Sequence, residues 1–404
     1  MSAFGALTQK QLPSAYPFLL GVEAAIASGT LLDYYRIGMV TNDAATTNTE
    51  VLSRKLLLEQ RVSIIRLFAP EHGIAISGAD GVAQADTTDP VTGLPVISLY
   101  RDDPAPQDQH LLDLDLVIFD VPDVGARFYT YLWTLSYVMQ ACERLSIPIM
   151  IMDRPNPISA LIADCEGPFL DEINCGSFLG RWNIPLKHSC TLGEMASYFK
   201  YLKMPDLNLT IFTMEGYSRH LRAGMHYPFQ PTSPALFRWQ GLVLYPGTCL
   251  LEGLNLNEGR GTSTPFECFG APWLDSALFI QSFPIDAFPY LSLKAITYVP
   301  HDSFYKNELC QGIELQLHTP EVRDAVSLGM TIISTLCKTQ GKTLHQRAYK
   351  TMVNPEGGQH LDRLTGIFHV YELFQRGLTP TIDIAAEWRD IIQPFLLYPN
   401  PTTA

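Results

Sequence analysis

The sequence predicts an α/β protein with a parallel sheet in its first half and a second part of mixed elements. Short, nearly continuous apolar runs recur along the first half, which is typical of strands buried on both faces. Segments with helical patterns lie between these runs, and repeated strand–helix–strand order indicates right-handed parallel crossovers. After about residue 225 this alternation is lost, and Pro, Gly and aromatic residues become dense.

Each element of the first half follows from its own pattern. Apolar runs predict strands at residues 36–42, 63–70, 114–122 and 148–155, with a further strand at 209–214. The intervening segments predict helices at 21–34, 46–60 and 128–145. A helix at 191–202 begins with Thr191 and Glu194, in the Thr-x-x-Glu spacing of a capping box.

The second part begins near residue 226, and its elements are less regular. The chain has 404 residues, which is enough for two domains. We expect one domain over residues 15–226 and another over 227–404. In the latter, a strand is expected at 312–317 and helices at 322–337 and 364–376.

Composition restricts the class of partner. The net charge of −13 disfavours a groove for nucleic acid or another polyanion. No run approaches the roughly 20 apolar residues of a membrane span, and the N-terminus lacks the pattern of a signal peptide. The eight Cys form no CxxC pair, which disfavours structural zinc and a disulfide framework. A cytoplasmic protein is expected, or one of the cell envelope if a leader was removed.

Polar residues gather where the predicted parallel strands end, which is the edge where such sheets bind ligands. Each of these residues alone is also a common helix N-cap or loop starter. Four strand ends that deliver acids, Arg, Asn and His to one edge nevertheless predict a site. The residues are Asn42, Glu71, His72, Asp120, Asp123, Arg127, Tyr129, Asp153, Arg154 and Asn156.

The usual cofactor motifs are missing. No G-x-G-x-x-G follows the first strand, and Gly341-Lys342-Thr343 lacks the upstream Gly of a Walker A loop. HExxH and G-x-S-x-G are absent as well. We therefore expect neither a nucleotide, nor a catalytic metal, nor a serine nucleophile. Paired carboxylates remain as the chemistry that the strand ends offer.

Several motifs stand in order along residues 70–273. They are P-E-H-G at 70–73, D-V-G-A-R-F-Y-T-Y at 123–131, D-R-P-N-P at 153–157, E-G-P at 166–168, T-x-G-E at 191–194, Y-P-G-T at 245–248, E-G-x-N at 252–255, E-G-R-G-T-x-x-P-F-E at 258–267 and G-A-P-W at 270–273. Together they resemble one family of bacterial peptidoglycan hydrolases, the exo-β-N-acetylmuramidase (NamZ, YbbC-like) family. The chain differs from the family pattern at Pro231 to Leu236, which lacks the expected Asn, and at His188 to Thr191, which replaces H-G-M-T.

The resemblance implies a fold and an activity. The fold is a Rossmann-like N-terminal domain followed by a smaller α+β C-terminal domain. The activity is release of N-acetylmuramic acid from the non-reducing end of peptidoglycan fragments, a small carbohydrate substrate. No metal or nucleotide cofactor is implied.

Two catalytic carboxylates are expected. Glu71 is the expected general acid, because partial desolvation just past a buried strand raises a carboxyl pKa; a helix-start carboxylate is the alternative. For its partner, Glu166 is favoured slightly over Asp153, and Asp120 and Asp123 also compete. Glu166 would leave room for a water and favour inversion, but the stereochemistry stays open.

Binding roles follow from side-chain chemistry. Arg127 or Arg154 can grip the lactyl carboxylate of N-acetylmuramic acid with two hydrogen bonds, or else form a structural salt bridge. Tyr129 offers a face for the sugar, and Asn42 an amide for its acetamido or hydroxyl groups. Further expected contacts are His72, Asp120, Asn156 and His188, with Glu258 and Arg260 closing the cleft from the second domain or bracing the domain interface.

Two other classes of function stay open at this stage. A Rossmann-type glycosyl or nucleotide transferase predicts tight nucleotide binding, against which the missing glycine motif counts. A non-catalytic muropeptide binder would keep Arg127 and the aromatic residues but would not need Glu71. Turnover of a chromogenic N-acetylmuramic acid glycoside separates all three.

Overall fold

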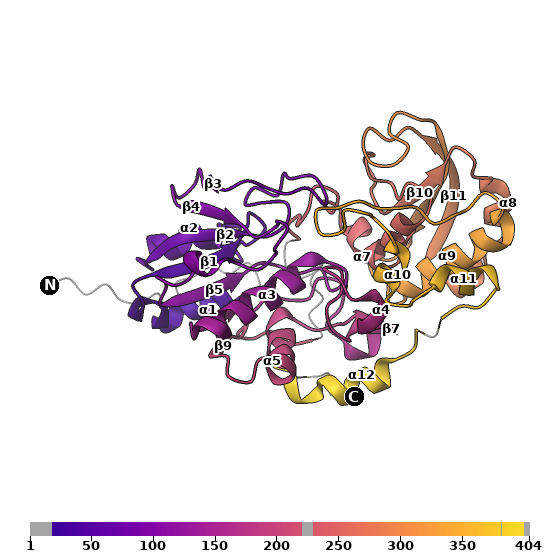
Figure 1. The fold of residues 1–404 in the computed structure, drawn as a ribbon. Coiled ribbons are helices and arrows are strands. Elements are labelled where there is room, and N and C mark those ends of the chain that lie inside the picture. Colours follow the sequence, from indigo (N-terminus) through magenta and orange to yellow (C-terminus); the bar gives the residue numbers. More distant parts are fainter. Residues whose placement is uncertain (1–17, 220–228, 381, 400–404) are drawn as a thin grey trace.

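The N-terminal domain is built on a seven-stranded sheet with strand order β3-β4-β2-β1-β5-β6-β9 (Figure 1). The computed structural model describes residues 18–219, 229–380 and 382–399. All neighbouring strands run parallel except β3 and β4. The strands are β1 (Ile37–Thr41), β2 (Ile64–Ala69), β3 (Thr87–Thr88), β4 (Pro95–Ser98), β5 (Leu116–Asp120), β6 (Ile149–Met152) and β9 (Leu209–Phe212). The predicted parallel sheet and its five strands are confirmed.

Both faces of the sheet are covered, which explains the continuous apolar runs. In β5, Val117 and Phe119 pack into the core on the face that carries α3. Leu116 and Ile118 point the other way, into the core that includes α1. The helices of this domain are α1 (Gly21–Ser28), α2 (Ser53–Glu59), α3 (Thr130–Leu145), the short α4 (Glu172–Cys175) and α5 (Leu192–Lys203).

The capping box at the start of α5 is present as expected. The Thr191 hydroxyl accepts from the Glu194 backbone N–H at 3.3 Å, and the Glu194 carboxylate accepts from the Thr191 N–H at 3.0 Å. This exchange satisfies two N–H groups that a helix start otherwise leaves unpaired. A hairpin of β7 (Glu166–Phe169) and β8 (Pro185–Lys187) precedes α5.

The C-terminal domain has a three-stranded antiparallel sheet of order β10-β12-β11, packed with helices. The expected strand at 312–317 and helix at 322–337 are confirmed. The single helix expected at 364–376 is wrong, because Gly366 (φ 79°) ends one helix and a second begins after His369. The elements are α7 (Trp239–Thr248), β10 (Cys268–Ala271), α8 (Ser276–Ser282), β11 (Leu291–Tyr298), β12 (Cys310–Leu317), α9 (Ala325–Gln340), α10 (His360–Thr365) and α11 (Val370–Gln375).

The end of the chain returns to the N-terminal domain, where α12 (Ala385–Ile392) lies beside α5 (Figure 1). The Trp388 indole N–H donates to the His188 carbonyl at 2.9 Å, and the Tyr198 ring packs edge-on against Trp388. The last residues therefore pack against the first domain in space. The expected division into residues 15–226 and 227–404 stays a prediction. The boundary expected near residue 226 lies outside the described residues.

Helices α7 and α9 touch through their backbones. A Cβ atom on Gly247 would lie 1.9 Å from the Ala325 carbonyl oxygen, and one on Gly329 would lie 2.3 Å from the Gly247 oxygen. Only glycine permits such an approach at either position. The contact fixes the 3₁₀ turn Cys249–Gly253, which follows α7 directly and carries Glu252.

We expect Gly329→Ala to lower the free energy of unfolding by about 1–3 kcal/mol or more, because the added methyl group overpacks a backbone contact. The measurement is the thermal unfolding midpoint, followed by circular dichroism. Gly358→Ala is the matched control, since a Cβ at Gly358 meets nothing within 4 Å. Equal midpoints for the two variants would contradict the assigned contact.

Candidate active site

Glu71 lies in a tight turn just after β2, with the left-handed residues His72 (φ 69°) and Gly73 (φ 76°) behind it. Its buried carboxylate accepts hydrogen bonds from the Gly81 N–H at 2.9 Å and from the Thr130 hydroxyl at 2.7 Å. Burial raises the pKa of Glu71 above that of an ordinary Glu, with His72 opposing the shift and Asp80 adding to it. A carboxyl whose pKa is raised by burial suits a general acid.

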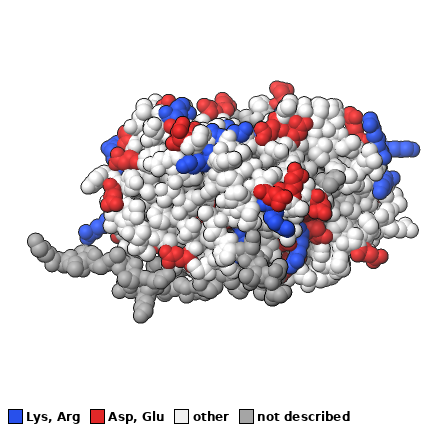
Figure 2. Space-filling view, turned by 90° about the horizontal axis from the view of Figure 1, so that it is seen from below, with Lys and Arg blue, Asp and Glu red and all other residues white. Residues whose placement is uncertain are grey.

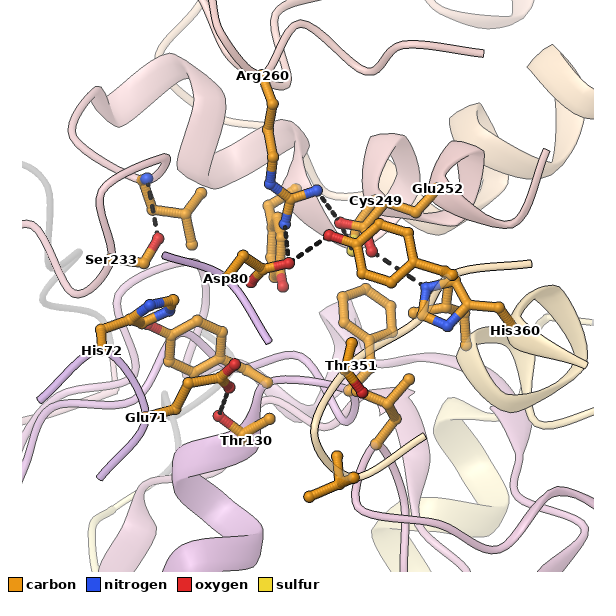
Figure 3. Close-up of a pocket in the computed structure, with 18 of the residues that line it drawn as sticks. Glu71, His72, Asp80, Thr130, Ser233, Cys249, Glu252, Arg260, Thr351 and His360 are labelled. Atoms are coloured by element: carbon orange, nitrogen blue, oxygen red, sulfur yellow. Dashed lines mark hydrogen bonds and ion pairs between the residues drawn. The ribbon is translucent and has the colours of Figure 1, made fainter. Parts of the chain in front are cut away.

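Glu71 opens into a pocket formed by both domains, with an empty volume of about 570 Å³ that includes open solvent (Figure 3). In the view of Figure 3, Arg260 descends from the C-terminal domain, and Glu71 and Thr130 face it from below. The N-terminal domain contributes Glu71, His72, Asp80, Tyr100, Tyr129 and Thr130. The C-terminal domain contributes Ser233, Tyr245, Glu252, Arg260, Tyr349, Thr351 and His360.

Arg260 is the centre of a charged network in this pocket. It pairs with Glu252, with Glu258 at 2.9 Å and with Asp80 at 3.5 Å. Burial alone would raise the pKa of Glu252, but Arg260 and His360 lower it to about 2. The charge of Arg260 is therefore shared among three carboxylates.

Asp80 faces Glu71 across the pocket. Its carboxylate accepts from the Tyr349 hydroxyl and, unlike Glu71, stays about one-third exposed (36%). Glu71, His72 and Asp80 each offer an atom within 4.8 Å of the others, and among the described residues this is the group that could hold a metal ion. Both Glu71 oxygens are already hydrogen-bonded, and His72 Nδ1 lies 3.0 Å from the Gly78 carbonyl.

Arg127, an expected sugar contact, does not line this pocket. Its guanidinium is fully buried and donates to the carbonyls of Pro168 (2.7 Å), Ile184 (2.9 Å) and Leu364 (3.2 Å). Burial lowers the pKa of Arg127 to about 9. Since Leu364 belongs to the C-terminal domain, Arg127 braces the domain interface.

Arg154 and Asp120 form a buried salt bridge beneath the strand ends. Two guanidinium nitrogens of Arg154 lie 2.6 and 3.0 Å from the two Asp120 oxygens. Arg154 also donates to the Thr46 carbonyl, so it fixes the loop after β1. Asn42 in that loop donates to the Tyr131 hydroxyl at 3.1 Å. None of these three expected site residues lines the pocket.

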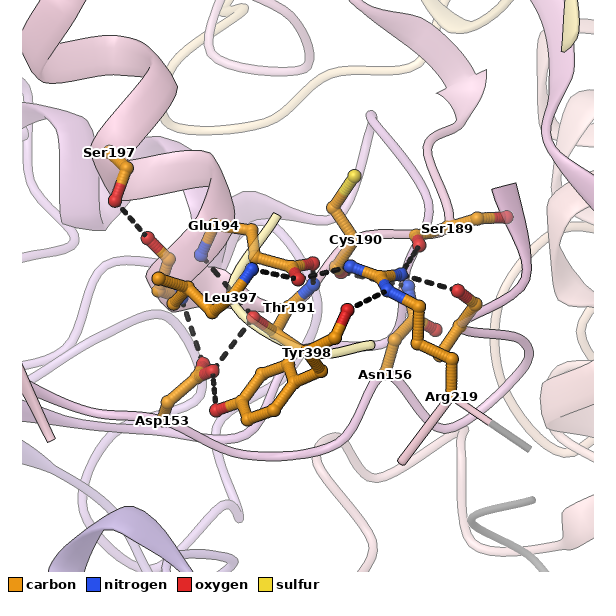
Figure 4. Close-up of polar contacts among 12 residues, drawn as sticks. Asp153, Asn156, Ser189, Cys190, Thr191, Glu194, Ser197, Arg219, Leu397 and Tyr398 are labelled. Carbon is orange, nitrogen blue, oxygen red and sulfur yellow. Dashed lines mark hydrogen bonds and ion pairs between the residues drawn. The ribbon is translucent and has the colours of Figure 1, made fainter. Parts of the chain in front are cut away.

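Asp153 holds the returning C-terminal segment (Figure 4). It accepts from the Thr191 hydroxyl (2.8 Å), the Gly193 N–H (2.8 Å) and the Tyr398 hydroxyl (2.5 Å). Burial raises the pKa of Asp153 to about 6. Nearby, Asn156 donates to the Cys190 carbonyl. Both residues lie outside the Glu71 pocket.

Glu166 sits at the start of α9 and not in the pocket. Its oxygens accept from the N–H groups of Val326 (3.1 Å) and Ser327 (3.0 Å), and Lys187 lies 3.4 Å away. Burial raises the pKa of Glu166, with Lys187 opposing. His188 does not line the pocket either.

Five of the expected residues reach the pocket or its network. Glu71, His72, Tyr129 and Arg260 line the pocket, and Glu258 lies behind Arg260. The expectation missed Asp80, Glu252, Tyr349 and His360 as site residues. Glu252 had a signal in the E-G-x-N motif, and Asp80 lies nine residues after Glu71 in a Gly-rich turn. Tyr349 and His360 had no local signal, because only the tertiary fold brings the tail to the pocket.

On the face shown in Figure 2, Lys and Arg are interspersed with Asp and Glu and form no continuous basic band. None of the described helices is both long and apolar enough to cross a bilayer.

Comparisons with known proteins agree with one another. Residues 37–240 match the family model "Exo-beta-N-acetylmuramidase NamZ, N-terminal", and residues 243–398 match its C-terminal counterpart. The peptidoglycan beta-N-acetylmuramidase NamZ of Bacillus subtilis (strain 168) is 36% identical over 303 residues, which cover 74% of this chain and 72% of that protein.

Two solved structures share the fold. Both are DUF1343 family proteins from Bacteroides fragilis. BF0371 aligns with a TM-score of 0.80 at 22% identity and covers 95% of this chain and all of its own (100%). BF0379 aligns with a TM-score of 0.70 at 25% identity, covering 95% and 99% of the two chains.

We expect no catalytic metal at Glu71, His72 and Asp80, because both Glu71 oxygens already accept hydrogen bonds from Gly81 and Thr130. Adding Mg²⁺, Ca²⁺ or Zn²⁺ to protein treated with EDTA should leave the unfolding midpoint unchanged, since a ligand of the folded state would raise it. A rise in the midpoint that Asp80→Asn abolishes would show that a metal does bind there.

Proposed function

This chain belongs to the exo-β-N-acetylmuramidase NamZ family, and from this premise we propose that Glu71 is the general acid of its glycosidase reaction. The protein is a peptidoglycan glycoside hydrolase that releases N-acetylmuramic acid. The observation that carries the assignment is a buried carboxyl of raised pKa that opens into a pocket between the two domains. A transferase or a purely binding protein is not supported by this family.

Asp80 is our candidate for the second carboxylate, in place of Glu166 and Asp153. An oxygen of Asp80 lies within 4.8 Å of one of Glu71. This upper bound on the oxygen–oxygen distance is nearer to the spacing of about 5–5.5 Å between the carboxyl groups of retaining glycosidases than to the roughly 6.5–9.5 Å of inverting ones. Arg260 and Tyr349 fix the orientation of Asp80 from the opposite domain.

The two carboxylates together account for a two-step displacement. Asp80 attacks the anomeric carbon, the glycosidic C–O bond breaks, and Glu71 gives its proton to the leaving oxygen. In the second step Glu71 takes a proton from water, and the resulting hydroxide displaces Asp80 from the sugar. Free N-acetylmuramic acid leaves, and Glu71 is protonated again.

Within this proposal the substrate is a peptidoglycan fragment with N-acetylmuramic acid at its non-reducing end, such as the disaccharide with N-acetylglucosamine. Neither Arg127 nor Arg154 reaches the pocket, and Arg260 is already shared by three carboxylates. We infer that hydroxyl donors such as Ser233 and Thr351 receive the lactyl group. A cytoplasmic location stays a prediction, supported by eight cysteines that are all free thiols.

We expect Glu71→Gln to lower kcat by about 10²- to 10⁴-fold on a chromogenic N-acetylmuramic acid glycoside, because the amide has no proton to give. Glu166→Gln is the matched control, since it makes the same change at a buried Glu outside the pocket. Both variants are first shown to be folded by their melting curves. Near-normal turnover of Glu71→Gln, or an equal loss in Glu166→Gln, would overturn the assignment.

The pH profile gives an independent reading of the same acid. Since Glu71 must be protonated to act and burial raises its pKa, kcat should persist above the pH where an exposed Glu has ionised. It should then fall as pH rises through that pKa. In Glu71→Gln the residual rate should lose this basic limb.

If Asp80 is the nucleophile, a β-linked substrate must release the β-anomer first, because two displacements restore the configuration. Proton NMR of the first-formed sugar measures this directly. Asp80→Asn should lower kcat by a factor similar to Glu71→Gln. Initial release of the α-anomer would exclude Asp80 as nucleophile and favour a single displacement by water.

A further inference from the structure

His360 lines the Glu71 pocket, yet the proposed reaction gives it no step. It is the first residue of α10 and is buried. Its Nε2 lies 3.2 Å from Glu252 Oε2, and its Nδ1 has no hydrogen-bond partner in the described part of the chain (Figure 3). The ring of Tyr349 stacks on the imidazole, with 4.5 Å between the ring centroids and 12° between the planes. One hydrogen bond and one stacking contact therefore hold this ring.

The backbone places His360 opposite Glu252. A Cβ atom on Gly253 would lie 2.6 Å from the Leu361 side chain, so the 3₁₀ turn that carries Glu252 packs tightly against α10. Burial alone would raise the pKa of Glu252, but Arg260 and His360 lower it to about 2. The carboxylate is then charged at neutral pH and can only accept hydrogen bonds. His360 Nε2 must therefore carry the proton that the two residues share.

Tyr349 connects the imidazole to the candidate nucleophile. Its hydroxyl donates to Asp80 Oδ2, and Arg260 lies 3.5 Å from the same oxygen. Arg347 is a second neighbour of the phenol ring, with its guanidinium carbon 5.1 Å from the ring centroid. The contacts thus run from Glu252 through His360 and Tyr349 to Asp80, all within the wall of one pocket.

Asp80 needs such support more than Glu71 does. Its side chain stays about one-third exposed (36%), and the charge of Arg260 is shared with two other carboxylates. The hydroxyl of Tyr349 is a directional donor, because a hydrogen bond weakens steeply when it bends. It can fix the carboxylate plane only while the phenol ring itself is fixed, and the stack on His360 supplies that restraint.

We propose that His360 is a positioning residue, which stacks on Tyr349 and so holds Asp80 in line for attack on the anomeric carbon. The inference rests on the proposed function, because it takes Asp80 as the nucleophile. His360 should then affect the rate of the chemical step more than substrate binding. A misplacement of about 1 Å can cost roughly 10²-fold in rate.

A double-mutant cycle on the chromogenic N-acetylmuramic acid glycoside tests this, with kcat and KM measured separately. Tyr349→Phe and His360→Leu should each lower kcat about 10- to 100-fold and change KM less than about threefold. The double variant should be no slower than the slower single variant, because His360 acts only through the Tyr349 hydroxyl. His369→Leu is the control and should keep normal kcat, since His369 is exposed and outside the pocket.

Two outcomes of the cycle would overturn the proposal. One is a normal kcat in either single variant, and the other is a double variant whose loss is the product of the two single losses. Near-normal turnover of Asp80→Asn would instead count against the proposed function. The coupling between residues 349 and 360 is measured independently of that result.

Conservative variants separate the stack from the hydrogen bond. His360→Phe keeps a flat ring for Tyr349 and should hold kcat within about threefold of the wild type. His360→Gln keeps an N–H for Glu252 but has no ring, so it should be as slow as His360→Leu. Melting curves first show which variants fold, and Tyr349→Phe, which removes a single oxygen, decides the matter if His360→Leu does not. A His360→Phe variant slower than His360→Gln would contradict the stacking role.

Discussion

The Glu71 pocket depends on one short turn, Asp80–Gly81, which contacts both domains. The Gly81 N–H donates to Glu71, and the Gly81 carbonyl accepts from Met352 of the C-terminal domain at 2.8 Å. Asp80 meets Arg260 and Tyr349. A Cβ on Gly81 would lie 2.7 Å from the Thr351 side chain, and the φ of Gly81 is 70°. Both the close approach and the left-handed backbone conformation favour glycine at this position. The two carboxylates keep their separation only while the domains stay docked through this turn.

Local patterns predict the sheet well, because a strand buried on both faces leaves a signature in its own residues. The apolar runs that form β1, β2, β5 and β6 carry this signature. The capping box at Thr191 is also visible in neighbouring residues, because it needs only Thr191 and Glu194. The C-terminal domain is harder to predict, since α7 is set by backbone contact at Gly247 and contains Pro246.

The residues of the candidate site differ in the same way: some have surroundings set by neighbouring residues, and others have partners far along the chain. Glu71 is predictable because its environment, the turn after a buried strand, is itself local. The roles of Arg127 and Arg154 are not predictable from the sequence. A guanidinium that binds a ligand and one that donates to buried carbonyls or a buried carboxylate have the same residue type. The partners that decide this lie far along the chain: Arg127 reaches Leu364, 237 residues away. Asp80 and Tyr349 show the converse, since 269 residues separate two groups in direct contact.

The polar residues at the strand ends therefore fall into two groups: those that hold the fold together and those that face the pocket. At β5 and β6, Asp120 with Arg154, and Asp153 with Tyr398, saturate each other and hold the loops and the returning tail in place. At β2, the C-terminal domain supplies the facing wall, so Glu71 stays buried yet open to a pocket. Asp123 lies between these cases, with one oxygen used by the fold and one left without a partner. A polar residue at a strand end is thus available for function to the extent that the second domain, rather than its own loop, completes its surroundings.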